Sequence, residues 1–130
     1  MHSRLGTKEE SSMLNTFLTK ASKPASVNSL PLGPIQQGLS LTGRERLRAD
    51  LELLIKTGHL PKGFPSKARV LVVEGEEDSI VIPSARQYLI EELLSHLEVP
   101  PTHWVLPGMG HTLLAPELSR RVLNWLEESL

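Results

Sequence analysis

Two side chains that could carry acid–base chemistry lie in short turns of this chain. Asp78 stands in Gly75-Glu-Glu-Asp78-Ser-Ile-Val81, directly after an apolar run, and His111 stands in Leu106-Pro-Gly-Met-Gly-His111. An imidazole acts as a general base when a carboxylate holds one ring nitrogen protonated and the other nitrogen faces the reacting group. The pair therefore predicts the acid and the base of a Ser-His-Asp triad.

Simpler roles for both residues stay open at this point. An aspartate after a strand commonly closes a turn or caps a helix, and a histidine after Gly-x-Gly can be a surface turn residue. The neighbouring Glu74, Glu76 and Glu77 could bind a divalent cation, although such a run is more often a solvated loop. His103 and His111 lack the spacing of metal ligands, so we expect neither a metal nor another cofactor.

The serine of such a triad is not found in the sequence. The usual nucleophile turn is Gly-x-Ser-x-Gly, placed between a buried strand and a helix. Ser40 follows Gly38 at the right distance, but Thr42 stands where the second glycine belongs and no β-branched strand precedes it. We therefore expect no nucleophile within this chain.

The elements that must position the two turns alternate between strand and helix. The run at 69–73 is apolar on both faces, which is typical of a buried parallel strand. Helical spacing covers 83–97, a second strand is expected at 103–106, and a last helix over 116–130 includes Leu130 on its apolar face. Because a helix lies between the two strands, we expect them to be parallel neighbours.

The first half of the chain has a different residue pattern, which predicts helices and a loop. Thr7 and Glu10 predict a capping box, in which each side chain bonds a free N–H at the start of the helix that follows. Prolines, glycines and serines predict a loop over 21–43, and leucine spacing predicts a second helix over 44–56. This half is expected to cover another part of a protein.

The expected fold class is therefore α/β. A helical segment that resembles a lid covers residues 1–62, and a parallel strand-helix-strand-helix unit covers residues 63–130. Two strands that are apolar on both faces leave an open edge and apolar helix faces, so a stable monomer of this segment would be surprising. We expect either self-association or a complementing chain.

Composition excludes several classes of partner. The 130 residues carry a net charge of −1 and 22% charged residues, which gives no reason to expect nucleic acid or an anionic membrane surface. There is no cysteine, no signal-peptide core at the N-terminus and no apolar run of membrane-spanning length. We expect one modest domain in the cytoplasm.

Residues 69–130 resemble the C-terminal end of an α/β-hydrolase, with its last two strands, their turns and the closing helix. Gly75-Glu-Glu-Asp78-Ser-Ile-Val81 is similar to the acid turn of that family, Gly-x-x-Asp-x-x-Val, and Gly108-Met-Gly-His111 is similar to its histidine turn. The two residues stand 33 positions apart and in the chain order of the family. The lid-like segment and the short final segment look most like small carboxylesterases resembling the pimeloyl-carrier-protein methyl ester esterase of biotin synthesis.

This resemblance implies a partial α/β-hydrolase fold and a carboxylic ester hydrolase that acts on small acyl esters. Asp78 would be the catalytic acid and His111 the catalytic base, whereas the serine and the oxyanion-hole donors would come from a missing half. The resemblance thus implies that this chain is a C-terminal portion and is inactive alone.

Two other interpretations fit part of the sequence. The chain could be a non-catalytic α/β interaction module that binds a partner, or itself, through its open strand edge. The run from Val70 to Asp78 also resembles the first strand and acidic pocket of a phosphorylation receiver domain. That fold needs several more strand-helix units, and only one clear strand follows Asp78, so the receiver interpretation is excluded by length.

Overall fold

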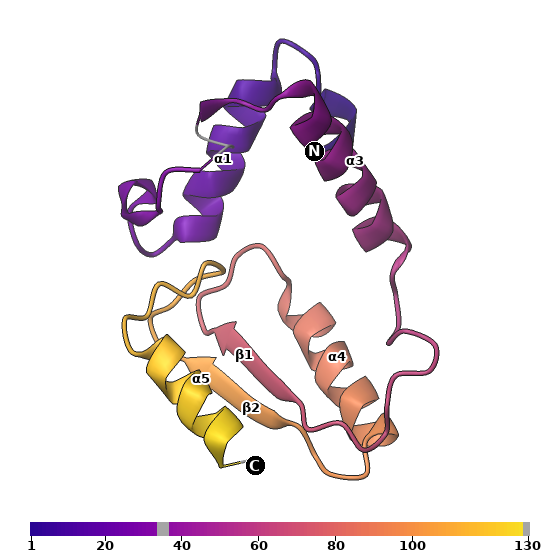
Figure 1. Ribbon diagram of the computed structural model, residues 1–130. Helices are drawn as coiled ribbons and strands as arrows, with labels where there is room; N and C mark the ends of the chain where they lie inside the picture. The colour runs from indigo at the N-terminus through magenta and orange to yellow at the C-terminus, as the bar shows by residue number, and fades with distance from the viewer. Residues whose placement is uncertain (34–36, 129–130) are drawn as a thin grey trace.

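The computed structural model describes residues 1–33 and 37–128 and consists of a helical part and an α/β part (Figure 1). The helical part holds η1 (His2–Arg4), α1 (Glu10–Ser22), η2 (Val27–Ser29) and α3 (Leu41–Lys56). The α/β part holds β1 (Leu71–Gly75), α4 (Pro83–His96), β2 (Thr102–Leu106) and α5 (Leu118–Glu127). Residues 34–36 of the expected loop and Leu130 of the expected last helix lie outside the described residues.

The sheet has two strands, and they run parallel as the sequence predicts. In the register, Val72 lies opposite His103 and Gly75 lies opposite Leu106. Because successive side chains alternate between the faces of a strand, the two faces of this sheet carry different residues. The described chain is therefore a mixed α/β protein, which confirms the expected fold class at this coarse level.

The helices α4 and α5 cover opposite faces of the sheet. Arg86 of α4 reaches the Glu74 carboxylate at 3.6 Å, on the face that also carries His103. On the other face, the Trp125 indole of α5 donates a hydrogen bond to the Thr102 hydroxyl at 3.0 Å. The two-stranded sheet is thus covered by one helix on each side.

The helical part has a small core of its own. Leu5, Met13 and Leu14 are buried together. Leu39, Leu47 and Leu51 pack against this cluster, so the apolar stripe of α1 meets the apolar face of α3. This cluster joins α1 and α3 independently of the sheet.

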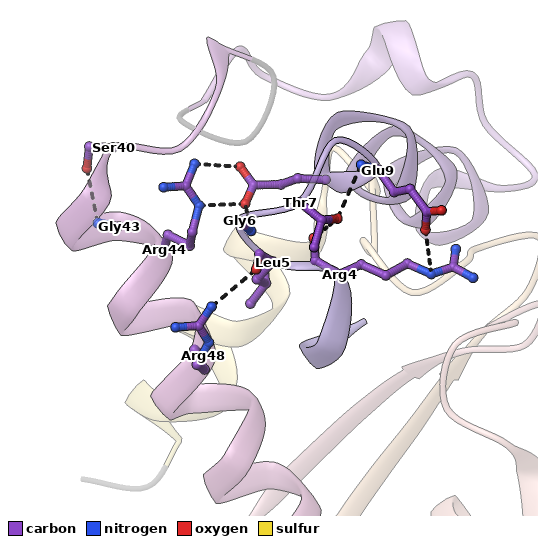
Figure 2. Close-up of polar contacts among 10 residues, drawn as sticks. Arg4, Leu5, Gly6, Thr7, Glu9, Ser40, Gly43, Arg44 and Arg48 are labelled. Atoms are coloured by element: carbon purple, nitrogen blue, oxygen red, sulfur yellow. Dashed lines mark hydrogen bonds and ion pairs between the residues drawn. The ribbon is translucent and has the colours of Figure 1, made fainter.

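An ion pair beside this core holds the same elements together (Figure 2). The Arg44 guanidinium of α3 donates two hydrogen bonds to the Glu10 carboxylate, at 2.6 and 2.8 Å. The backbone N–H of Gly6 donates to the same carboxylate at 2.5 Å, and Arg48 donates to the Leu5 carbonyl at 3.2 Å. We call the Glu10–Arg44 pair the clamp. Such two-bond pairing restrains orientation as well as distance.

The predicted capping box at the start of α1 is wrong in its pairing. The Thr7 hydroxyl accepts from the N–H of Glu9 at 3.2 Å, and the Glu10 carboxylate bonds Gly6 and Arg44 instead of Thr7. Gly6 has a φ of 81°, and this left-handed turn presents its N–H to Glu10. A partner 34 residues away thus takes the carboxylate that the local pattern assigns to the cap.

Helix limits also differ from the sequence prediction. α3 begins at Leu41 because the Ser40 hydroxyl accepts the N–H of Gly43 at 3.0 Å and so acts as its N-cap. α1 continues to Ser22, and α5 begins at Leu118, two residues after Pro116. Ser40, which the sequence excludes as a nucleophile, therefore has a structural role.

Large apolar side chains stay exposed on the α/β part. Leu123 of α5 is 58% exposed and Val105 of β2 is 48% exposed, in agreement with the expected uncovered helix faces. On α3, Leu54 and Ile55 are exposed as well, beyond the turns that meet the core of the helical part. A separate finding is that none of the described helices combines the length and apolar character that crossing a membrane requires.

Candidate functional site

The acid turn (75–81) and the histidine turn (108–111) are hydrogen-bonded to each other at the carboxyl ends of the two strands. The N–H of Glu76 donates to the Leu106 carbonyl at 3.0 Å, and the N–H of Glu77 donates to the Met109 carbonyl at 2.9 Å. These bonds extend the β1–β2 ladder into the turns, so the parallel register fixes the turns relative to each other. The φ of Gly108, 67°, lets the chain reverse directly after β2.

This arrangement brings Asp78 and His111 into direct contact. Asp78 Oδ2 lies 3.0 Å from His111 Nδ1. Asp78 Oδ1 accepts two backbone N–H groups, from Ile80 at 2.8 Å and from Val81 at 3.0 Å. The Asp78 side chain is 7% exposed and that of His111 is 37% exposed. Asp78 therefore closes its own turn, as the simpler interpretation has it, and holds the imidazole at the same time.

The surroundings of Asp78 favour its charged form. Burial acts to raise the pKa of this carboxyl, but the hydrogen bond from His111 and those from the Val81 and Ile80 amides outweigh it, and the net pKa is lowered. An ionised carboxylate at Nδ1 favours the tautomer protonated there. The other ring nitrogen, Nε2, is then an acceptor suited to a general base.

A hollow of about 340 Å³ lies beside this pair, along the outer side of β1. Asp78 and His111 line it, and so do the charged side chains of Glu74 and Arg86. The rest of the lining is Gly75 and the apolar residues Val72, Val73, Val81, Ala85, Leu89 and Leu113. Within the described residues, His111 has a single hydrogen-bond partner, Asp78, so its Nε2 meets no hydroxyl or thiol. We call this space the edge hollow. It could hold an apolar group next to the imidazole.

The C-terminal end of α1 contacts both turns. The Ser79 hydroxyl, next to Asp78, donates to the Lys20 carbonyl at 3.1 Å. The N–H of Thr112, next to His111, donates to the Ala21 carbonyl at 3.3 Å. The last carbonyls of a helix have no hydrogen-bond donors within the helix. Here Ser79 and Thr112 supply those donors. We call this contact the α1 brace, because one helix end joins the acid turn to the histidine turn.

Two glycines make these close contacts possible. A Cβ on Gly110 would collide with the Lys23 carbonyl just after α1, and a Cβ on Gly75 would collide with the carbonyls of Met109 and Gly110. Both obstacles are backbone atoms, which cannot move aside as a flexible side chain could. Glycine is therefore needed at Gly75 and Gly110 for close approach of the backbone.

The other candidates from the sequence are placed away from this pair or in other roles. Glu74 belongs to β1 and is 16% exposed, with His103 Nε2 at 3.3 Å from its carboxylate. This half-buried pair departs from the solvated loop suggested for Glu74. Residues 1–33 and 37–128 contain no group of three His, Cys, Asp or Glu side chains arranged to hold a metal ion.

Sequence reasoning missed three residues around the site. Arg86 donates to the Gly75 carbonyl at 3.0 Å, where the acid turn begins, and its buried Nε lacks a hydrogen-bond partner among the described residues. Ser79 and Thr112 form the α1 brace. The only feature of the sequence that could point to Ser79 and Thr112 is that each directly follows a candidate catalytic residue. No local pattern connects either residue to a helix end some 60 to 90 positions earlier.

The chain was compared with family models, with curated proteins and with solved structures, and none of them matches it. The contact between Asp78 and His111 is therefore the main observation that bears on function.

Proposed function

We propose that this chain supplies the acid, the base and the lid of a carboxylic ester hydrolase of the α/β-hydrolase type. A separate polypeptide segment would supply the serine nucleophile and the oxyanion-hole donors. The observation that carries the proposal is the 3.0 Å contact between His111 Nδ1 and a largely buried Asp78 carboxylate. Small acyl esters are the substrate class that the resemblance implies.

The roles follow from the chemistry of the two groups. The Asp78 carboxylate accepts a hydrogen bond from His111 Nδ1–H and stays ionised, so it stabilises the imidazolium that forms when His111 Nε2 removes the proton of a serine hydroxyl. His111 then returns that proton to the leaving alcohol, which completes acyl transfer to the serine. The edge hollow supports these roles, because an acyl chain lying against Val73 and Leu89 would be next to the His111 imidazole.

The test is complementation with a second polypeptide that carries Gly-x-Ser-x-Gly between a buried strand and a helix, sought first in the reading frames next to this gene. Both polypeptides are co-expressed and assayed with a short p-nitrophenyl ester. We expect activity that falls about 10⁴-fold in Asp78→Asn and by a similar factor in His111→Ala. The matched control is His59→Ala, since the His59 side chain is 76% exposed and is on the linker before β1.

Two results would contradict this proposal. One is activity that both substitutions leave unchanged. The other is a serine-dependent burst of product from this chain alone, because we expect no turnover without the added segment.

A second candidate function, a non-catalytic interaction module, is favoured by the outer edge of β1. Val70 accepts from Thr102 and Glu76 donates to Leu106, so even-numbered residues of this segment face β2. Leu71 and Val73 accordingly direct their N–H and C=O groups away from β2, where an incoming strand could pair with them. Within the described residues, the sheet has no third strand.

Proline substitutions separate this function from the hydrolase proposal. Leu71→Pro removes an outward N–H and keeps the β1–β2 ladder, whereas Val72→Pro removes a ladder donor. For an interaction module, sedimentation analysis would show an oligomer that Leu71→Pro disrupts and that His111→Ala leaves intact. A chain that is monomeric at all concentrations, without a partner captured through this edge, would contradict it.

A further inference from the structure

A second hollow, of about 860 Å³, lies between α1 and the acid turn. Each residue that lines it has a polar side chain. Most of them lie on one face of α1 or directly after it, including Asn15, Thr19, Lys20 and Lys23, and Ser79 lines it from the acid turn. We call this space the polar hollow. It contrasts with the edge hollow, whose lining is mainly aliphatic.

The charge of the polar hollow is positive. Lys20 and Lys23 both line it, no carboxylate does, and neither lysine forms an ion pair with a carboxylate of the described residues. The acid turn carries Glu76 and Glu77, yet only its Ser79 reaches this side. Glu76 lines a different hollow, together with Glu74 and His103. No carboxylate of the acid turn lines the polar hollow itself.

The remaining donors suit an anion as well. The Ser79 hydroxyl donates to the Lys20 carbonyl, and the Thr16 hydroxyl donates to the Ser12 carbonyl, so these two hydroxyl groups have structural partners. The Asn15 amide and the Thr19 hydroxyl have no such bond within the described residues and can donate to a ligand. Two ammonium groups and two neutral donors would thus surround a bound oxyanion.

The polar hollow adjoins the candidate catalytic pair. Ser79 directly follows Asp78, so their Cα atoms are roughly 4 Å apart. Asp78 lines the edge hollow, and the next residue, Ser79, lines the polar hollow. A ligand that extends across the acid turn could therefore place an anionic group at the lysines and an ester bond near His111.

We propose that the polar hollow binds an anionic group, a phosphate or a carboxylate, carried by the ester substrate. This inference rests on the proposed hydrolase function for its biological meaning, whereas the binding itself does not require catalysis. Both lysines are solvent-exposed, so a small free anion is expected to bind in the millimolar range at low ionic strength.

The test is an NMR titration of the full chain with inorganic phosphate at low salt and constant ionic strength. Saturable shifts are expected at the amides of α1 and Ser79. The double variant Lys20→Gln/Lys23→Gln is expected to weaken binding about tenfold. The matched control is Lys62→Gln/Lys67→Gln, which removes the same charge from two exposed lysines outside the polar hollow and is expected to bind phosphate normally.

A parallel titration with acetate distinguishes the two sources of the anion. Tighter binding of phosphate than of acetate assigns a phosphate-bearing ester, and the reverse assigns a substrate with a free carboxylate. Equal weakening by both double variants, or shifts that do not saturate, would overturn the proposal. Saturable phosphate binding combined with no ester hydrolysis after complementation would instead retain the anion site and reject the hydrolase proposal.

Discussion

The two parts of the molecule differ in how they are held together. Of the eight buried apolar side chains among the described residues, five lie in the helical part, at Leu5, Met13, Leu14, Leu18 and Ala21. The α/β part, which carries Asp78 and His111, contributes three, at Leu93, Leu97 and Leu106. Its helices keep large apolar residues such as Leu123 and Leu126 exposed. The part with the candidate chemistry therefore contributes fewer of the buried apolar side chains.

This difference shows how the candidate site keeps its geometry without a large sheet. Hydrogen bonds within and between the turns set the position of Asp78, and the α1 brace joins both turns to the better-packed helical part. Hydrogen bonds between side chains and the backbone define geometry even when each contributes only about 1 kcal/mol. The helical part is therefore a structural support of the candidate site.

The largest expected effect is on the helical core. Leu14→Ala removes a side chain that is 3% exposed and should lower the free energy of unfolding by about 3 kcal/mol. The control Leu123→Ala, at a position 58% exposed, should change it by less than about 0.5 kcal/mol. Denaturant unfolding measures both, and hydrogen exchange should show the loss of protection in α1 and α3. An equal loss of hydrogen-exchange protection throughout β1 and β2 would mean that the helical part and the α/β part unfold as one unit.

A smaller effect is expected where α1 meets the histidine turn. Gly110→Ala places a methyl group against the Lys23 carbonyl and should lower the free energy of unfolding by about 2 kcal/mol. It should also weaken the downfield proton signal of His111 Nδ1–H, since the turn must shift. Gly58→Ala is the control, because nothing lies within 4 Å of its added methyl group and its φ is not in the left-handed region. An unchanged signal in Gly110→Ala would argue against the α1 brace.

The next largest effect on stability is expected at the N-cap of α3. Ser40→Ala removes the acceptor for the Gly43 N–H and should cost about 1 kcal/mol of the free energy of unfolding. Ser11→Ala, on the exposed side of α1, is expected to have no measurable cost. The same measurement tests whether Ser40 is only structural. A complemented hydrolase that loses all activity in Ser40→Ala while remaining folded would contradict that assignment.

The smallest expected effect is the pH dependence of the clamp. The hydrogen bond from Arg44, followed by that from Gly6, lowers the pKa of Glu10 from 4.5 to about 2. Because the folded pKa is below its ordinary value, the stabilisation from the clamp is fully present above pH 4.5 and is lost as the pH falls towards 2. Urea midpoints measured over this window should fall with pH.

Two variants make this measurement specific. Glu10→Gln should remove the part of the pH dependence that Glu10 causes, whereas Glu45→Gln, on α3 and without an ion pair in the described residues, should leave it in place. A wild-type midpoint that is flat between pH 4.5 and 2.5, relative to Glu10→Gln, would contradict the assignment.

Local patterns in the sequence were sufficient for the elements and for the candidate pair. The β-branched run of β1, the Pro83 start of α4 and the left-handed Gly108 after β2 act through neighbours in the chain, so periodicity and turn chemistry predict them. The helix limits were predicted less accurately. α3 begins earlier than expected because Ser40 caps it, and α5 begins at Leu118, after Pro116. The contact between Asp78 and His111 followed from one further rule, that carboxyl ends of parallel strands meet at one edge.

Only the tertiary structure decided the other contacts between groups that are distant in the sequence. The Glu10 carboxylate bonds Arg44, 34 residues away, and the Ser79 hydroxyl bonds the Lys20 carbonyl, 59 residues away. Side chains such as these have many partners within reach of the unfolded chain, and local propensity does not choose among them. Packing of α1 against α3 and onto the turns makes that choice, because it brings one donor and one acceptor together and excludes the others. The sequence by itself thus determined the candidate acid and base, and the fold determined what holds them in place.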